Sequence, residues 1–543
     1  MFKTEKKLVG WHIAVALTAL SIGGFFGPLQ AWEHAGWNLY PSMQPYIASY
    51  YQGLTIHGIG NALVFTTFFI TGFLSYITAT SLDRPLATPK LSWAGFFTMV
   101  VGLVVALIPL FLNLASILYT MYPPMMAPWY FYVAMVLVVV GSWMSGWSIM
   151  ITFAKWRKDN PGKTAPFQAF AATITMALWQ ICTLGIAAEM LILIIPWSLG
   201  LVPGIDVQLA RTLFWFTGHP LVYFWLLPAY LSWYGMMPKQ ADGKLFSDTM
   251  ARFAFWLFLL LSTPIGFHHQ YVDPGVPAGW KYLHAILTYA VFFPSLLTAF
   301  NVAASLEIGG RKRGGKGLLG WIKNLPWNDP SYTAQNLAMI IFIFGGAGGV
   351  INASYNINLV IHNTAWVPGH FHLTVGTAAT FSFMGIMYWL VPPLTGKAIM
   401  RKTALWQAWL WAAGMLIFSR GLHWIGLLGA PRRTMLGVAI DNYGTGEWQV
   451  ASLMTGVGGT ILLISGLLFF YVIIHGAFFS KEEVVVEIPV AEPLHDEVVP
   501  AWLNNWKPWL IAVFALIIVA YAPMIINLVT DGAAFSPGFQ VWG

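Results

Sequence analysis

The sequence predicts an all-α integral membrane protein with about 13 transmembrane helices, and two observations lead to this fold class. First, 58% of the 543 residues are hydrophobic and only 9% are charged, whereas a soluble protein carries about 25% charged residues. Second, the hydrophobic residues form successive runs of the roughly 20 residues that cross a hydrocarbon core of about 30 Å. Because backbone polar groups in lipid must be paired within the protein, each run is predicted to be a helix.

The predicted spans follow one another with short connections. They cover approximately residues 9–31, 52–80, 92–117, 128–154, 168–198, 208–237, 250–272, 281–306, 335–359, 364–394, 404–428, 449–479 and 508–530. We expect residues 1–480 to form a twelve-helix core. The acidic, proline-containing stretch at 481–507 is predicted to be a cytoplasmic linker, and residues 508–543 an appended C-terminal transmembrane helix with an outer tail.

Lysine and arginine are distributed unequally between the two sides of the predicted bundle. With the N-terminus in the cytoplasm, all but five of the 27 Lys and Arg residues fall in cytoplasmic segments; the five are Arg211, Lys281, Arg420, Arg432 and Arg433. This asymmetry follows the positive-inside rule and predicts a cytoplasmic N-terminus. The net charge of +7 therefore reflects membrane orientation, and no nucleic-acid partner is expected.

Six of the 13 histidines lie at one predicted depth in the membrane. Counted from the outer ends of their spans at 1.5 Å per residue, they sit roughly 6–15 Å below the outer surface. The six are His57, His219, His268, His269, His370 and His372. A single membrane histidine is more often a hydrogen-bonded packing residue, but six in one layer favour metal binding, because neutral imidazole is the commonest metal ligand.

Helix geometry separates these histidines into groups. His370 and His372 are about 200° apart around a helix axis, so they point to opposite sides, as axial ligands of two hemes on either side of one helix would. His57, from another helix, can complete a six-coordinate iron with one of them. His268 and His269 differ by about 100° and can converge if Pro264 kinks the helix. His219 can add a third nitrogen, and three imidazoles with an open position suit copper or zinc.

The segments "YYQGLTIHG", "GHPLVYFWLLPAY", "TPIGFHHQ" and "VPGHFHL" resemble catalytic subunit I of the heme–copper oxygen reductases, over essentially the whole chain. Leu221 stands where many A-branch members of this family have glutamate. The sequences of the motifs are instead similar to the B branch, which uses heme b with an a- or o-type heme. The resemblance implies the heme–copper oxidase bundle as the fold. It also implies a set of ligands: His57 and His372 for the low-spin heme iron, His370 for the high-spin heme iron, and His219, His268 and His269 for the copper ion CuB.

The resemblance further implies that Tyr223 is covalently joined to His219 and supplies an electron and a proton during O–O cleavage. An i,i+4 pair on one helical face makes such a bond sterically reasonable. Tyr230 and Tyr234 continue this face toward the cytoplasm. Thr298, Asn301 and Ser305 form a polar stripe on the eighth span, and Ser247 lies near the cytoplasmic mouth.

We interpret these residues together as one proton path. The alternative is that the tyrosines pack and the hydroxyls bond backbone carbonyls, which is common in membrane helices. Asn301 departs from the threonine expected in close relatives, so we expect extra water at that point. Asn358 stands where an outer aspartate is expected, which weakens a role for this position in loading pumped protons.

Charged residues on the outer side offer two further interpretations. Arg432 and Arg433 are predicted to pair with heme propionates as guanidinium–carboxylate forks; the alternative is an ordinary solvated pair. Arg211 and Asp273 are predicted to form a structural ion pair. We assign no role to Arg420 or Glu189.

The resemblance implies a terminal respiratory oxidase of the bacterial cell membrane that reduces O2 to water and translocates protons. It also implies a subunit II carrying CuA that accepts electrons from cytochrome c, and a small single-helix subunit is a further expected partner. A quinol-fed oxidase and a nitric oxide reductase are alternatives in the same superfamily, although Tyr223 argues against the reductase. A membrane metal transporter would explain histidines in the membrane, but not a "HFH" pair that faces two ways.

Overall fold

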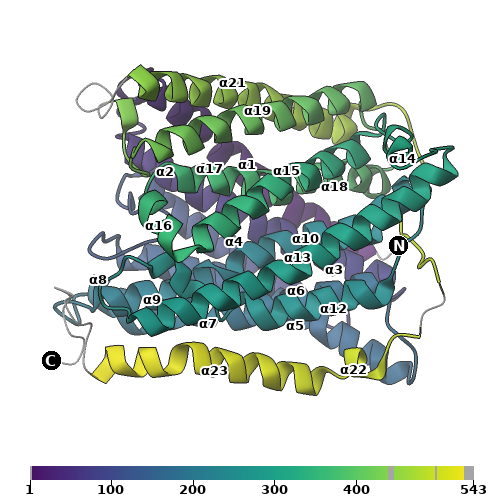
Figure 1. The fold of residues 1–543 in the computed structure, drawn as a ribbon, viewed down its shortest axis with the longest axis horizontal. Helices are drawn as coiled ribbons and strands as arrows, with labels where there is room; N and C mark the ends of the chain where they lie inside the picture. The colour runs from purple at the N-terminus through teal and green to yellow at the C-terminus, as the bar shows by residue number, and fades with distance from the viewer. Residues whose placement is uncertain (1–2, 438–445, 496–497, 531–543) are drawn as a thin grey trace.

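The computed structural model describes residues 3–437, 446–495 and 498–530, and within these residues it is a helical bundle whose only extended pairings are three isolated bridges (Figure 1). The first half contains α1 (Lys3–His34), η1 (Tyr40–Met43), α2 (Tyr50–Gly58), η2 (Ile59–Phe65), α3 (Thr66–Ser81), α4 (Pro89–Phe111), α5 (Trp129–Asp159), α6 (Phe167–Cys182), α7 (Leu184–Ala188), η3 (Glu189–Ile194), α8 (Ile195–Ser198), α9 (Val207–Gly218), α10 (Pro220–Gly235) and α11 (Met237–Gln240). The second half contains α12 (Asp248–Ser262), η4 (Gly266–Gln270), α13 (Ala278–Lys312), α14 (Gly320–Lys323), α15 (Pro330–Ala353), α16 (Tyr355–Ile361), α17 (Trp366–Leu373), η5 (Thr374–Ala379), α18 (Thr380–Thr395), α19 (Arg401–Leu427), α21 (Gly446–Ile474), η6 (His475–Phe479), α22 (Ala501–Asn504) and α23 (Trp506–Thr530). The predicted all-α membrane class is confirmed.

Ten helices among the described residues are long and apolar enough to cross a membrane by length and composition. The three other predicted spans correspond to α9–α10, α12–η4 and α19. Two of them are interrupted: α9 and α10 meet at His219, before Pro220, and α12 ends at Ser262, before Pro264. The helix interruption expected at Pro264 is present and is a full break rather than a kink, because proline cannot supply the backbone N–H that a continuous helix requires. The total of thirteen spans stays a prediction.

Large apolar side chains cover the outside of the bundle as well as its core. Leu191, Ile286 and Leu467 are each about three-fifths exposed, as expected for side chains that face lipid rather than water. Where helices approach closely, small residues make the contact. A Cβ on Gly95 of α4 would lie 2.5 Å from the carbonyl oxygen of Gly141 on α5, so this crossing depends on glycine, as is common between membrane helices.

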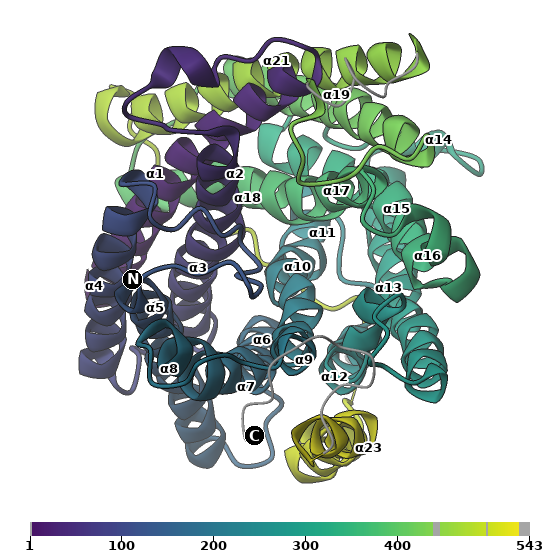
Figure 2. The same ribbon diagram turned by 90° about the vertical axis from the view of Figure 1, so that its left-hand side faces the viewer.

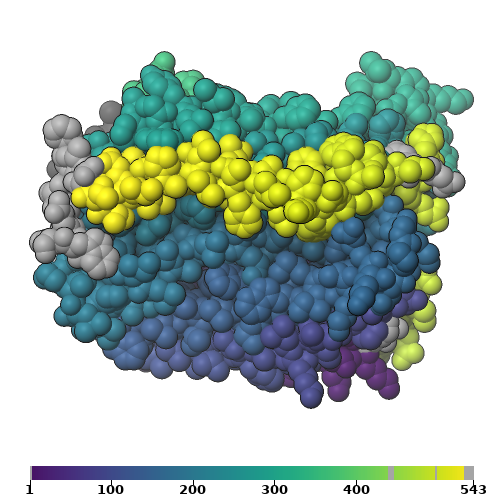
Figure 3. Space-filling model, turned by 90° about the horizontal axis from the view of Figure 1, so that it is seen from below, coloured from purple at the N-terminus to yellow at the C-terminus, as the bar shows by residue number. Residues whose placement is uncertain are grey.

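The C-terminal helix α23 runs along one side of the bundle (Figures 1 and 3). The segment before it packs on the core through backbone hydrogen bonds. The N–H of Leu245 donates to the carbonyl of Glu492 at 2.9 Å, and the N–H of Ala491 donates to the carbonyl of Gly235 at 2.7 Å. The predicted linker thus lies against the loop after α10 and α11, and α23 begins at Trp506, near the predicted residue 508.

Figure 2 looks along the helices of the bundle, with α10 near the centre of the view. Two segments of the bundle are π-helical rather than α-helical. The π-helical turn η2 begins two residues after His57, and the π-helical turn η5 begins two residues after His372. Such turns occur frequently at functional sites. His57 and His372 therefore each lie just before a point where the regular α-helix is interrupted.

Candidate active site

Three histidines from two separate segments form one cluster. His219 lies at the junction of α9 and α10, and His268 and His269 lie in η4. One ligand atom from each of the three lies within 4.8 Å of the others. The Nδ1 atom of His219 is 3.0 Å from Nε2 of His269. Two nitrogens bound tetrahedrally to one metal at about 2.0–2.1 Å would lie about 3.3 Å apart, so the donor set fits a copper or zinc ion.

Neighbouring side chains orient these rings. Nδ1 of His268 is 2.9 Å from Oγ1 of Thr288, which leaves Nε2 available as a ligand atom. The ring of His269 stacks on Trp215, with centroids 3.7 Å apart and planes inclined by 5°. Partners of this kind hold a ligating imidazole in one tautomer and one orientation.

Tyr223 lies one helical turn after His219, and its hydroxyl oxygen is 3.3 Å from Nε2 of that histidine. His219 therefore turns Nδ1 toward the histidine cluster and Nε2 toward the tyrosine. The predicted covalent link between the two residues stays a prediction. The contact does place a phenolic O–H directly beside the predicted copper ligands.

The imidazoles of His57 and His372 face each other from α2 and α17. Their ring centroids are 6.4 Å apart and their planes are inclined by 20°. Nδ1 of His57 lies 2.9 Å from the carbonyl oxygen of Gly23, and Nδ1 of His372 lies 2.7 Å from that of Pro368. Each ring thus donates from Nδ1 and keeps Nε2 as its free lone pair, and two metal–nitrogen bonds of about 2.0 Å each fit within the separation. This is the donor set that a six-coordinate heme iron needs.

His370 lies on the opposite side of α17 and lines a different space. The lining of that space also includes the three-histidine cluster, Tyr223 and Arg432. Among the described residues, Nδ1 of His370 has no hydrogen-bond partner. The expectation that His370 and His372 face two ways agrees with these surroundings. A histidine donor that shares this space with a three-histidine cluster is of the kind that a heme beside a second metal requires.

Two arginines follow α19, and the first of them, Arg432, lines this cavity. Within the described part of the chain, Nε of Arg432 and Nη2 of Arg433 are buried without hydrogen-bond partners. Burial and the adjacent positive charge of Arg433 lower the pKa of Arg432 to about 10. A buried guanidinium nitrogen without a partner is costly, so carboxylate groups such as heme propionates fit this place.

The arginine loop is anchored to the end of α1. The carboxylate of Glu33 accepts hydrogen bonds from the backbone N–H groups of Leu436, at 3.1 Å, and Gly437, at 2.9 Å. Sequence reasoning missed this residue, because nothing local to Glu33 indicates a partner about 400 positions away.

The predicted proton-path residues of α10 and α13 face each other across the interior. The hydroxyl of Tyr234 donates to Oγ1 of Thr298 at 2.8 Å, and that of Tyr230 lies 3.5 Å from Oγ of Ser295. Ser295 was not among the predicted residues. Its position three residues before Thr298 was the available signal, because i and i+3 share a helix face.

Asn301 and Ser247 meet at the predicted cytoplasmic side of this row. The side-chain oxygen of Asn301 accepts from the N–H of Ser247 at 3.1 Å, and its amide donates to the carbonyl of Ser247 at 2.7 Å. The amide of Asn301 therefore holds the loop before α12, and the neighbouring Ser305 donates from its hydroxyl to the carbonyl of Asn301 at 2.7 Å.

Several other polar residues of the transmembrane bundle have defined partners or none. Arg211 binds both carboxylate oxygens of Asp273 at 3.0 Å each, so the predicted ion pair is confirmed. Nδ1 of His362 lies 3.0 Å from the side-chain oxygen of Asn358. Both carboxyl oxygens of Glu189 are buried without a hydrogen-bond partner among the described residues.

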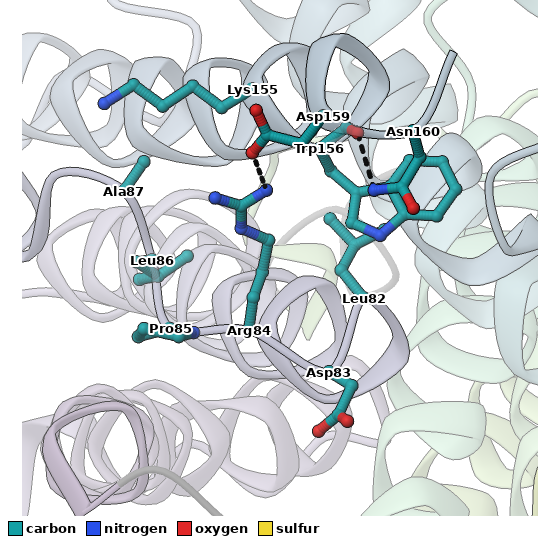
Figure 4. A pocket seen from close by; sticks show the side chains of 10 residues that line it. All are labelled: Leu82, Asp83, Arg84, Pro85, Leu86, Ala87, Lys155, Trp156, Asp159 and Asn160. Atoms are coloured by element: carbon teal, nitrogen blue, oxygen red, sulfur yellow. Dashed lines mark hydrogen bonds and ion pairs between the residues drawn. The ribbon is translucent and has the colours of Figure 1, made fainter. Parts of the chain in front are cut away.

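A second hollow lies away from the histidines, between the α3–α4 connection and the end of α5 (Figure 4). Arg84 and Asp159 form an ion pair across it, at 3.0 Å. Its lining contains no histidine. The histidine-lined cavity is therefore the candidate active site.

Known proteins that are similar to this chain are subunits of respiratory oxidases. Residues 7–461 match the family model described as "Cytochrome C and Quinol oxidase polypeptide I". The chain is 43% identical to cytochrome c oxidase subunit 1 of Thermus thermophilus, over 99% of this chain and 97% of that protein. It is 24% identical to quinol oxidase subunit 1 of Bacillus spizizenii, over 88% of this chain and 73% of that protein. A heme-copper terminal oxidase dimer solved by cryo-electron microscopy matches with a TM-score of 0.94 and 36% identity, covering 99% of this chain and 96% of that one.

Proposed function

Because this chain belongs to the family of cytochrome c and quinol oxidase polypeptide I, the heme–copper oxidoreductases, we propose that it is the subunit of a proton-translocating terminal oxidase in which O2 is reduced to water. One observation carries the proposal: a single cavity is lined by the three-histidine cluster, by His370 and by Tyr223. A metal transporter does not require a second imidazole site and a phenol in the same cavity as its metal ligands.

The residues that would hold the cofactors follow from the site. His57 and His372 would hold a low-spin heme b, and His370 a high-spin heme of the a or o type. His219, His268 and His269 would hold CuB, with Arg432 and Arg433 at the heme propionates. When bound, the heme iron and copper supply the electron-transfer and oxygen-binding chemistry that side chains lack.

The side chains of α10 and α13 would deliver protons to this site. Tyr223 holds a proton at its phenolic oxygen next to His219, where it can donate to the reacting oxygen and give up an electron. Tyr230 and Tyr234 hold further protons, each beside a hydroxyl of α13. Asn301 and Ser247 form the cytoplasmic end of the row, where bound water would continue the path.

The orientation and partners complete the proposal. The Lys and Arg asymmetry supports a cytoplasmic N-terminus in a bacterial cell membrane. A subunit II carrying CuA would pass electrons from cytochrome c, and a small single-helix subunit would cover part of the lipid face. The motifs and the 43% identity to the Thermus cytochrome c oxidase subunit support cytochrome c as donor and the B branch as subtype.

The proposal is tested by O2 consumption of the complete membrane complex with two donors supplied separately. Reduced cytochrome c is expected to support turnover that cyanide abolishes. Turnover only with a quinol would overturn the donor, and an absence of O2 uptake with either donor would overturn the oxidase assignment.

A further inference from the structure

The segment that carries His268 and His269 begins at a broken helix. α12 ends at Ser262, Pro264 follows, and the 3₁₀ turn η4 begins at Gly266. Proline removes one backbone donor and prevents the helical hydrogen bonds from continuing. Inside a membrane bundle, the peptide groups released by such a break must find partners within the protein.

Tyr521 of the C-terminal helix α23 supplies two of these partners. Its hydroxyl accepts a hydrogen bond from the N–H of Gly266 at 2.9 Å and donates to the carbonyl of Thr263 at 3.1 Å. The side chain of Tyr521 is only 2% exposed. One hydroxyl thus bridges the two sides of the break. A Cβ on Gly266 would collide with this hydroxyl and with the carbonyl oxygen of Trp215, so the close approach requires glycine here.

His284 of α13 satisfies the next peptide group and ties it to the same helix. Its Nδ1 accepts from the N–H of Phe267 at 3.1 Å, and its Nε2 lies 3.0 Å from the carbonyl oxygen of Ala520. Because Nδ1 accepts, Nε2 carries the proton and donates to Ala520. The ring of His284 packs at 4.3 Å from that of Phe267 and at 5.1 Å from that of Tyr521.

These contacts end one residue before the proposed copper ligands. Beyond the ligands, Arg211 holds Asp273 through two hydrogen bonds of 3.0 Å. The short segment with His268 and His269 is therefore fastened at both ends. Groups behind the ligands of a metal set the angle and distance at which those ligands meet the ion.

We propose that Tyr521 and His284 are positioning residues for the copper ion, and that α23 is part of the catalytic apparatus rather than only a membrane anchor. The inference rests on the proposed function, since it requires His268 and His269 to bind copper. The family match ends at residue 461, so this support comes from a helix outside the segment that the family model describes. Figure 3 shows α23 along the surface of the bundle. The hydroxyl of Tyr521 on this helix contacts the N–H of Gly266, the first residue of η4.

The first test is Tyr521→Phe in the complete complex, which keeps the ring and removes only the hydroxyl. We expect copper to be lost to an excess of chelator roughly 10- to 100-fold faster than from the unmodified protein. The infrared C–O stretch of carbon monoxide transferred to copper by light should also shift or broaden, while the low-spin heme spectrum stays unchanged. The control is Tyr471→Phe, because Tyr471 is 53% exposed on α21.

A second pair of variants decides the case if Tyr521→Phe also disturbs the hemes. His284→Gln retains one acceptor and one donor, whereas His284→Phe retains neither. Faster copper loss from His284→Phe, with copper retention partly restored in His284→Gln, would support the positioning role of Tyr521 and His284. Copper retention and C–O stretch equal to the unmodified protein in both Tyr521→Phe and His284→Phe would overturn it. An unmodified complex without copper would instead refute the proposed function, and this inference with it.

Discussion

Tyr234 gives the sharpest test of the proposed proton path. Its hydroxyl is fully buried and donates to Oγ1 of Thr298 at 2.8 Å. Thr298 donates in turn to the carbonyl of Pro294, also at 2.8 Å. The substitution Tyr234→Phe therefore removes one proton-bearing group and leaves the donor of Thr298 paired.

The expected loss of stability is small. A neutral hydrogen bond contributes about 1 kcal/mol net, so Tyr234→Phe should lower the free energy of unfolding by about that amount. Proton uptake should slow much more, since a positioned proton-transfer group contributes on the order of 10²-fold or more to rate. Metal and heme contents should be unchanged, because Tyr234 contacts none of the six histidines through a hydrogen bond.

The assay is stopped-flow proton uptake by the fully reduced complex mixed with O2, followed with a pH-sensitive dye. Tyr388→Phe is the matched control, because Tyr388 is 2% exposed and donates to the side-chain oxygen of Gln407 at 2.7 Å, outside the path. That control should cost about 1–3 kcal/mol, since the side-chain oxygen of Gln407 loses its donor, without slowing uptake. Equal uptake rates for Tyr234→Phe and the unmodified complex would refute the reasoning.

Three further variants test other parts of the site. His372→Ala should abolish the low-spin heme absorbance and leave high-spin heme that binds carbon monoxide; an unchanged reduced spectrum would remove His372 from the ligand set. Tyr223→Phe should assemble both hemes yet reduce O2 at least about 10²-fold more slowly, and retained turnover would show that its phenol is dispensable. Glu33→Gln leaves one acceptor oxygen for two backbone N–H groups, so it should cost about 1–3 kcal/mol and lower the temperature at which heme is released. An unchanged release temperature would show that the arginine loop does not depend on that carboxyl group.

The membrane class and the grouping of histidines could be predicted because both depend on local sequence. Apolar runs report the membrane directly, and the positions of His219, His268 and His269 within their spans predicted a shared depth. The opposite directions of His370 and His372 follow from helical geometry alone. These inferences needed no knowledge of which helices are neighbours.

Features that depend on distant contacts could not be predicted. Tyr521 lies 255 positions from Gly266 along the chain, and its role appears only when α23 is seated against η4. The sequence predicts extra water in the proton path at Asn301, whereas in the fold the side-chain amide of Asn301 forms hydrogen bonds with the backbone of Ser247. Ser295 is a different case, because its spacing of three residues from Thr298 already indicates the same helix face.

The central claim is that six histidines hold two hemes and one copper in a shared layer of the bundle. The most direct measurement is the heme and copper content of the purified complex, by pyridine hemochrome spectra and elemental analysis, normalised to this chain. The account predicts two hemes of different type and one copper in addition to those of any CuA-bearing partner, with that copper lost in His219→Ala. One heme per chain, or a copper content that His219→Ala leaves unchanged, would contradict it.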